Sequence, residues 1–167
     1  MEAHEQTVSE ISNRVKSFYE RQQPFRAYHG ATNSTRVVSF DPKTIVDTSS
    51  LSNMFSIDKE NSCAIVKPNV AMDQLVEETL KSGLVRPVIP EFPGITVGGA
   101  FSGTAAESSS FKYEYFDWAV NWVEIVLADG EIVKVSNTEL SDLFSGIVGG
   151  FGTLGYNTFR NWTHTGY

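Results

Sequence analysis

Three segments rich in glycine and small polar residues are the best suited to bind a ligand; they cover residues 28–35, 94–110 and 149–155. The first contains Gly30, Ala31, Thr32, Asn33, Ser34 and Thr35. Small side chains let backbone N–H groups approach an anion, and the hydroxyl and amide groups add donors, so a diphosphate is a suitable ligand. A surface turn is the alternative, because glycine, asparagine and serine are also common in turns. The third segment, taken alone, is typical of a flexible turn.

The second segment, residues 94–110, has a single charged side chain, that of Glu107. Because so few of its residues are bulky, we expect either a ligand or closely approaching backbone beside it. A glycine-rich loop packed on itself is the alternative. No lysine follows the glycines, which excludes a P-loop, and the spacing of Gly98, Gly99 and Gly103 differs from the dinucleotide-binding fingerprint.

Other kinds of chemistry find little support in the sequence. No His, Cys or carboxylate residues have metal-ligand spacing, no Ser-His-Asp arrangement is apparent, and the single cysteine excludes an internal disulfide. Of the three histidines, His4 and His164 are expected in mobile chain ends, whereas His29 adjoins the first segment. A net charge of −7 without a cluster of Lys and Arg argues against nucleic acid as a partner.

Length and composition indicate one globular domain. At 167 residues, with 41% hydrophobic and 12% aromatic residues, the chain is long enough to bury a core. The N-terminus has neither the basic nor the apolar region of a signal peptide, and no apolar run is long enough for a transmembrane segment. We therefore expect a location in the cytoplasm or at the periphery of an internal membrane.

Hydrophobic periodicity and turn residues predict the elements that would position these segments. Helical spacing predicts helices over residues 5–22 and 71–82 and a short helix from Asp142. Short or alternating apolar runs predict strands at residues 25–28, 37–40, 44–46, 54–58, 63–66, 118–128 and 131–135, with a tight turn at Asp129-Gly130. Since no regular βαβ period is present, the expected fold class is α+β, with a first lobe over about 25–90 and a second, antiparallel lobe over about 95–157.

The order of the three segments resembles that of the FAD-binding (PCMH-type) domain of the vanillyl-alcohol oxidase superfamily, and within it that of the delta-24 sterol reductases. The resemblance covers roughly residues 25–156. It rests on linked motifs in the family's order, namely Pro90-Glu91, Thr96-Val97-Gly98-Gly99, Gly103-Thr104, Glu107-Ser108-Ser109-Ser110, Lys112-Tyr113, Asp129-Gly130, Ser141-Asp142-Leu143-Phe144 and Gly152-Thr153-Leu154-Gly155.

The resemblance implies a cofactor and the residues that would hold it. FAD would bind non-covalently, although some members of the superfamily attach it through histidine and His29 adjoins the first segment. Residues 30–35 would cradle the diphosphate, and Ser108, Ser109 and Ser110 would lie near the phosphates or the ring edge. The flavin and its ribityl chain would lie along Thr96, Val97, Gly98, Gly99, Gly103 and Thr104, and the adenine end along Val126, Gly152, Thr153, Leu154 and Gly155.

Three departures from the family pattern stand out. Glu114 replaces a glycine of the signature, residues 156–167 are polar and aromatic where the family continues with an apolar strand, and no substrate domain follows. Residues 156–167 are therefore not expected to continue the sheet. We expect a truncated domain with an N-terminal helix over 1–24, an FAD-binding region over 25–157 and a divergent tail over 158–167.

The function implied by the resemblance is that of a flavin-dependent oxidoreductase domain. Reduced flavin would deliver hydride to a carbon–carbon double bond of a sterol, with NADPH as the electron donor. No catalytic residue is identified, because the family's substrate domain usually supplies such groups. A non-catalytic FAD-binding remnant, or a domain that relies on a partner chain to complete the site, is the alternative.

Overall fold

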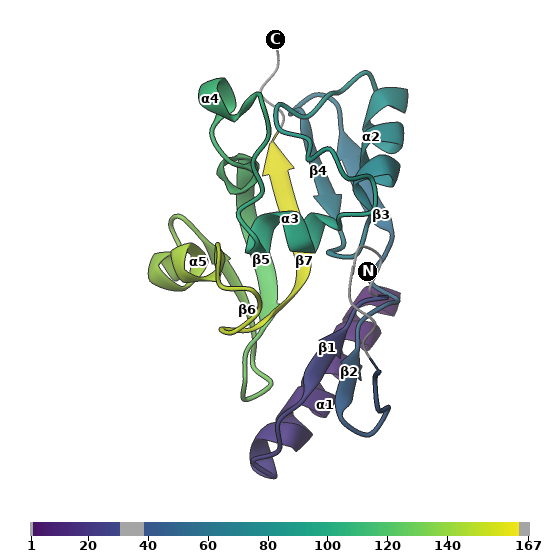
Figure 1. Cartoon of the computed structure of the whole chain (residues 1–167), viewed down its shortest axis with the longest axis vertical. Helices are drawn as coiled ribbons and strands as arrows, with labels where there is room; N and C mark the ends of the chain where they lie inside the picture. The colour runs from purple at the N-terminus through teal and green to yellow at the C-terminus, as the bar shows by residue number, and fades with distance from the viewer. Residues whose placement is uncertain (1, 31–38, 164–167) are drawn as a thin grey trace.

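Two lobes of unequal size make up the chain in the computed structural model, which describes residues 2–30 and 39–163 (Figure 1). The smaller lobe contains helix α1 (Glu2–Glu20) and a two-stranded parallel sheet of β1 (Arg26–Tyr28) and β2 (Ile45–Asp47). The larger lobe is built on a five-stranded antiparallel sheet, in the order β3 (Met54–Asp58), β4 (Cys63–Val66), β7 (Tyr156–Thr163), β5 (Val120–Val126) and β6 (Ile132–Ser136).

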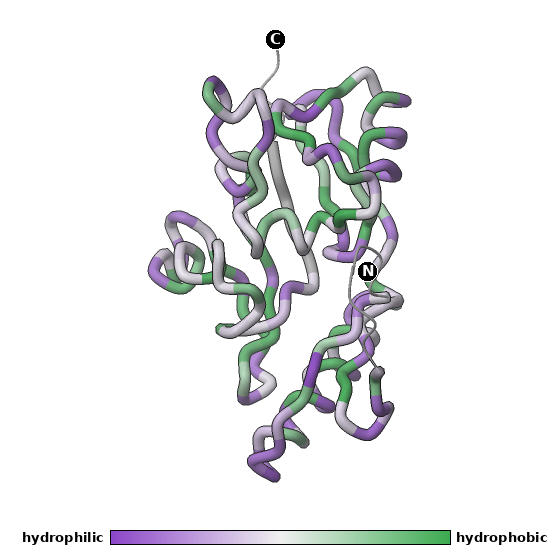
Figure 2. Tube along the Cα trace, in the orientation of Figure 1, coloured by the Kyte–Doolittle hydropathy of each residue, from purple (hydrophilic) through white to green (hydrophobic). Residues whose placement is uncertain are grey.

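The remaining elements belong to the larger lobe. They are α2 (Met72–Lys81), α3 (Val97–Ser102), α4 (Ser110–Tyr113), the 3₁₀ helix η1 (Phe116–Ala119) and α5 (Ser141–Ile147). Hydrophobic residues recur along the strands and on the inner face of α2, where Met72 and Leu75 are buried in the main core (Figure 2). Among the described residues, no helix is long and apolar enough to cross a membrane.

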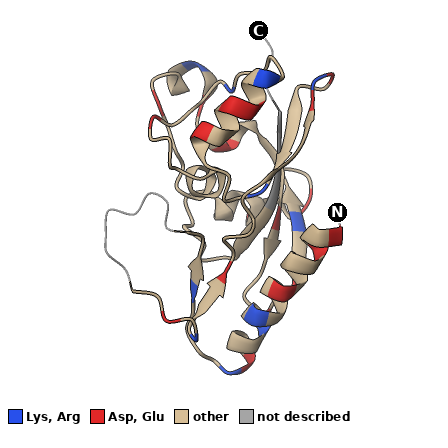
Figure 3. Ribbon diagram, turned by 90° about the vertical axis from the view of Figure 1, so that its right-hand side faces the viewer, with Lys and Arg blue, Asp and Glu red and all other residues tan. Residues whose placement is uncertain are grey.

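Helix α1 packs on the smaller sheet through the apolar face that its sequence periodicity predicts. Val8, Ile11, Val15 and Phe18 are all at most 3% exposed, and they form one cluster with Val46, Leu51 and Val126. The charged residues of α1, coloured in Figure 3, alternate with these apolar positions, and Glu5, Glu10, Lys16 and Glu20 are exposed. Because Val126 belongs to β5, the cluster also joins the smaller lobe to the central sheet.

The turn between β5 and β6 makes a second connection between the lobes. Gly130 has a φ of 89°, which favours glycine, and a Cβ at this position would lie 2.8 Å from Lys16 Cβ. The hydroxyl of Ser12 donates to the Gly130 carbonyl at 2.6 Å. The Asp129-Gly130 turn predicted from the sequence therefore also provides a docking surface for α1.

Strand β7 corrects two expectations drawn from the sequence. Residues 156–163 form a strand that pairs with both β4 and β5, although their polar and aromatic composition argued against a continuing sheet. This pairing joins the hairpin of β3 and β4 to β5 and β6 in one sheet. The larger lobe therefore includes residues 54–66, and the boundary expected near residue 90 is wrong.

His4 was expected in a mobile end, but it is only 6% exposed. Its Nε2 lies 3.1 Å from Glu124 Oε1, and that carboxylate oxygen also accepts from the Thr158 hydroxyl at 2.6 Å. Burial lowers the pKa of His4 below 6.5, and this effect outweighs the hydrogen bond with Glu124. His164, and residues 37 and 38 of the expected strand at 37–40, lie outside the described residues; Ser39 and Phe40 are in no strand.

The start of the glycine-rich segment 94–110 forms helix α3 rather than an open loop. The hydroxyl of Thr96 caps it by accepting the Gly99 N–H at 3.0 Å. Gly98 N–H donates to the Pro68 carbonyl at 2.6 Å, and a Cβ at Gly98 would lie 2.9 Å from that oxygen. At Gly98, the closely approaching group is therefore backbone of the chain itself.

Candidate functional site

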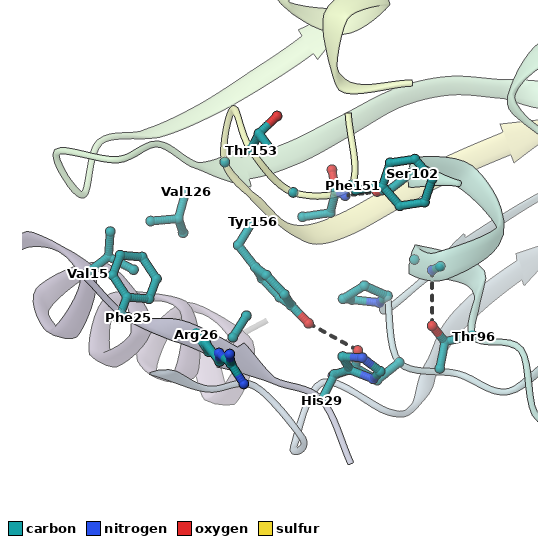
Figure 4. A pocket seen from close by; sticks show the side chains of 18 of the residues that line it. Val15, Phe25, Arg26, His29, Thr96, Ser102, Val126, Phe151, Thr153 and Tyr156 are labelled. Atoms are coloured by element: carbon teal, nitrogen blue, oxygen red, sulfur yellow. Dashed lines mark hydrogen bonds between the residues drawn. The ribbon is translucent and has the colours of Figure 1, made fainter. Parts of the chain in front are cut away.

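A pocket of about 730 Å³ opens between the two lobes (Figure 4). Its walls come from β1, from α3, from the end of β5 and from residues 151–157, with Val15 of α1 at one end. Figure 4 shows Val15, Phe25 and Val126 at one end, Thr96 and Ser102 at the other, and Tyr156 between them. Pockets for cofactors and other small molecules have volumes of roughly 300–1,000 Å³, so this one is large enough for a ligand of that class.

The pocket brings together residues from the second and third glycine-rich segments, which are about 50 positions apart in the chain. The lining includes these residues predicted from the sequence: Thr96, Gly98, Gly99, Gly103, Val126, Gly152, Thr153 and Gly155. Gly30, Val97, Thr104 and Leu154 do not line it. The predicted site residues Ala31, Thr32, Asn33, Ser34 and Thr35 lie outside the described part of the chain.

The three consecutive serines of the family motif make hydrogen bonds to Glu107 and Pro87 around a turn. Glu107 accepts from the Ser108 hydroxyl and, at 2.5 Å, from the Ser109 N–H, and these bonds lower the pKa of Glu107 to about 2. The Ser109 hydroxyl donates to the Pro87 carbonyl, and the Ser110 hydroxyl accepts the Glu107 N–H. These serines hold helix α4 in place, outside the lining of the pocket.

Glu114, which replaces a glycine of the family motif, also lies outside the lining of the pocket. It ends α4 with a φ of 63° and a ψ of −159°, and its side chain is exposed. Glycine adopts this backbone conformation at little cost, whereas other residues rarely do. The glycine of the motif is therefore explained by the backbone conformation at this position, and its replacement places no carboxylate in the pocket.

The charge of the pocket suits an anionic ligand. Among the described residues that line it, none is acidic, and the only fully charged side chain is the exposed Arg26, with His29 nearby. This lining contrasts with the net charge of −7 of the whole chain. A wall without carboxylates avoids repulsion of a diphosphate, and a guanidinium can pair with one.

Sequence reasoning missed a buried polar network that includes Thr48 and the pocket-lining residue Asn69. The hydroxyls of Tyr156 and Thr48 are 2.6 Å apart, and Thr48 also donates to the Tyr28 carbonyl at 2.8 Å. Tyr156 Oη lies 3.2 Å from Asn69 Oδ1, whose amide nitrogen donates to the Thr48 carbonyl (Figure 4). Thr48 is fully buried and Asn69 is 7% exposed. This network ties β7 to the smaller lobe, and no local pattern in the sequence indicates it.

Ser102 and Asn157 form a second polar pair that the sequence did not indicate. Both line the pocket, and the Asn157 amide donates to the Ser102 hydroxyl at 3.1 Å. Asn157 is 6% exposed, and its Oδ1 has no hydrogen-bond partner among the described residues. A buried acceptor of this kind fits a ligand that brings its own N–H or O–H groups, as FAD does.

The sequence matches the family model described as FAD binding domain over residues 3–136. It is 34% identical over 157 residues to the delta(24)-sterol reductase of Homo sapiens, covering 92% of this chain and 30% of that protein. It is also 43% identical over 111 residues to the delta(24)-sterol reductase of Pisum sativum, covering 66% of this chain and 20% of that protein.

Solved structures share the same fold. The 6-hydroxy-D-nicotine oxidase of Arthrobacter nicotinovorans matches with a TM-score of 0.80 at 21% identity, covering 93% of this chain and 34% of that one. A chitooligosaccharide oxidase matches with a TM-score of 0.78 at 18% identity, covering 93% and 33%. The chain thus spans about a third or less of the length of these relatives. Because the family model covers most of its residues, the chain belongs to the FAD binding domain family, of the PCMH type.

Proposed function

We propose that the chain holds FAD in the pocket between its lobes and serves as the cofactor-binding part of a reductase of the delta-24 sterol reductase type. The observation that carries this proposal is the pocket itself. Its lining combines the glycine-rich residues of the family motifs with a complete absence of acidic side chains among the described lining residues. Membership of the FAD binding domain family supports FAD as the ligand.

The residues of the pocket suit an elongated cofactor with two unlike ends. Arg26 offers positive charge to a diphosphate, and His29 and the small and polar residues 30–35 proposed from the sequence offer hydrogen bonds. Val15 and Val126 supply an apolar wall for the adenine end. The small residues of α3 leave room for the flavin and its ribityl chain, and those of the segment 152–155 leave room for the adenine end.

The proposed chemistry belongs to the cofactor, and the chain contributes binding and orientation. Bound FAD would supply hydride to a carbon–carbon double bond of a sterol, after reduction by NADPH. The relatives that support this activity are named delta(24)-sterol reductases, and the chain spans 30% of the human one. Within the chain, Tyr156 and Asn69 of the larger lobe both hydrogen-bond to Thr48, which follows β2 of the smaller lobe, and so connect the two lobes beside the pocket.

An FAD-binding protein without turnover, or one that relies on a partner chain, is the second candidate. Phe151 lines the pocket and is 80% exposed, and Phe111 and Trp118 are 90% and 70% exposed. Exposed apolar side chains that gather in one patch are typical of surfaces that another protein covers, and Phe151 lies at the pocket itself. A partner chain in this position would shield the flavin and complete the substrate site.

Absorbance of the purified chain after addition of FAD tests the proposal. We expect a yellow protein that keeps its flavin through gel filtration and releases all of it on acid precipitation, as non-covalent binding requires. Reduction by NADPH with conversion of a sterol would support the reductase. A yellow protein that NADPH and sterol do not change would favour the second candidate. A protein that stays colourless with FAD would overturn both.

A further inference from the structure

We propose that Ser102 and Asn157 form a polar subsite that receives an uncharged group of the bound ligand, one able to donate and accept a hydrogen bond. This inference rests on the proposed function, because it concerns the same pocket. It assigns a binding role to two residues outside the glycine-rich motifs of the family. Ser102 is the last residue of α3, and Asn157 is the second residue of β7.

Folding leaves one buried hydrogen-bond acceptor of Asn157 unused. Asn157 is 94% buried, its amide nitrogen donates to Ser102 Oγ at 3.1 Å, and its Oδ1 has no partner among the described residues. Burial of an unsatisfied polar group is unfavourable, so such groups are rare in folded proteins. Because Asn157 lines the pocket, a ligand donor can satisfy this oxygen.

Asn69 provides a comparison within the same pocket. It is also buried, at 7% exposed, but both ends of its amide are engaged: Nδ2 donates to the Thr48 carbonyl and Oδ1 lies 3.2 Å from Tyr156 Oη. Both bonds of Asn69 are made within the chain, as expected of an asparagine that stabilises the fold. Asn157 makes only one such bond, which distinguishes it from a purely structural residue.

Both residues line the pocket, and the pair carries complementary hydrogen-bonding groups. Ser102 Oγ accepts from Asn157 and therefore retains its own proton for donation, while Asn157 Oδ1 remains an acceptor. One donor beside one acceptor matches a hydroxyl group, or a ring edge in which N–H and C=O are adjacent. Both chemistries occur in FAD, in the ribityl chain and in the flavin ring respectively.

The position of the pair within the pocket argues against the diphosphate as its partner. Figure 4 shows Ser102 at the α3 end, with Thr96 and Phe151, whereas Arg26 lies toward the opposite end. Neither Ser102 nor Asn157 carries charge, and a diphosphate has no proton for Asn157 Oδ1 at neutral pH. The subsite therefore suits the uncharged flavin or ribityl part of the cofactor.

The test compares Asn157→Leu with Asn69→Leu, which is the matched control. Each variant of the full chain is titrated with FAD by flavin fluorescence, and its thermal unfolding is measured without FAD. For Asn157→Leu we expect FAD binding weakened about ten-fold, as for loss of one ligand hydrogen bond, with an unfolding temperature equal to or above that of the wild type. For Asn69→Leu we expect a lower unfolding temperature, because Asn69 is bonded at both ends.

Several outcomes decide the inference. If the wild type does not bind FAD, the proposed function fails as well; if it binds FAD and Asn157→Leu binds equally well, only the subsite is refuted. A loss of thermal stability in Asn157→Leu as large as in Asn69→Leu would show a structural role and refute it too. Should Asn157→Leu not fold, Ser102→Ala gives the same test, with several-fold weaker binding expected and unchanged binding refuting the subsite.

FAD methylated at ring N3 identifies which part of the cofactor the pair receives. If the flavin ring is bound, the methyl group removes its donor, so wild type and Asn157→Leu should bind this analogue with equal affinity. If a ribityl hydroxyl is bound, the ten-fold difference should persist. Either result supports the subsite, provided that the variant binds unmodified FAD more weakly than the wild type does.

Discussion

Replacement of Tyr156 by phenylalanine tests the network that joins the two lobes. The change removes a single hydroxyl, which lies 2.6 Å from Thr48 Oγ1 and 3.2 Å from Asn69 Oδ1. Thr48 is fully buried and Asn69 is 7% exposed, so water cannot readily replace the lost partner. Loss of one partner from a buried polar group costs about 1–3 kcal/mol. For a domain of this size, a loss of about 2 kcal/mol corresponds to a fall of about 4–8 °C in Tm.

The measurement is urea unfolding of both proteins, with thermal unfolding as a second readout. We expect Tyr156→Phe to lower the midpoint without a change in m, because the area exposed on unfolding is nearly the same. Tyr19→Phe is the matched control, since Tyr19 is 58% exposed, and we expect it to leave stability unchanged. Equal stability of Tyr156→Phe and the wild type would refute the reasoning, because the network would then contribute nothing.

Two further predictions concern the docking of α1. Burial lowers the pKa of His4 below 6.5, so the unfolded chain binds a proton more readily than the folded one, and stability should fall as the pH drops below about 6.5. Urea unfolding between about pH 8 and about pH 5 should show this loss, and His4→Gln should reduce it; an unchanged pH profile in the variant would contradict the assignment. Gly130→Ala should destabilise the chain more than Gly83→Ala in thermal unfolding. Both glycines have positive φ, but only at Gly130 would a Cβ collide with Lys16, so equal losses would show that the collision is relieved.

Local sequence patterns predicted most of the helices and hairpins, because those elements depend on neighbouring residues. The apolar face of α1, with Val8 and Ile11, follows from a spacing of three and four residues. The hairpin of β3 and β4 follows from two apolar runs on either side of a polar turn. Gly83, the first residue after the helix predicted over 71–82, has a φ of 74°, a conformation typical of glycine at the end of a helix.

Strand β7 could not be predicted in the same way. Its residues 156–163 are polar and aromatic, and their strand conformation depends on pairing with β4 and β5, which are distant in the chain. Such long-range pairing determines the order of strands and therefore the boundary between the lobes. Asn157 and Tyr156 escaped attention for the same reason, since their importance arises only from the neighbours that the sheet brings to them.

The glycines of the candidate site show what composition alone cannot predict, namely which glycine is required for packing and which faces the pocket. Gly98 and Gly99 are equivalent in the motif, but a Cβ at Gly98 would lie 2.9 Å from the Pro68 carbonyl oxygen. Gly99 is exposed on the pocket wall, and a Cβ there would meet only Thr96 Oγ1, at 3.2 Å. A substitution at Gly98 would therefore disturb folding before it tested ligand binding. Only the folded structure separates the glycine required for packing from the one that faces the pocket.

Titration with FAD of the wild type, Gly99→Ala and Gly99→Glu, followed by flavin fluorescence, tests most directly whether this pocket holds the cofactor. Both substitutions occupy an exposed position, so both variants should fold, which thermal unfolding would verify. We expect the wild type and Gly99→Ala to bind one FAD each, and Gly99→Glu to lose binding because it adds bulk and negative charge to a wall without acidic residues among those described. Equal FAD affinity in folded Gly99→Glu, or no saturable binding by the wild type, would contradict this account.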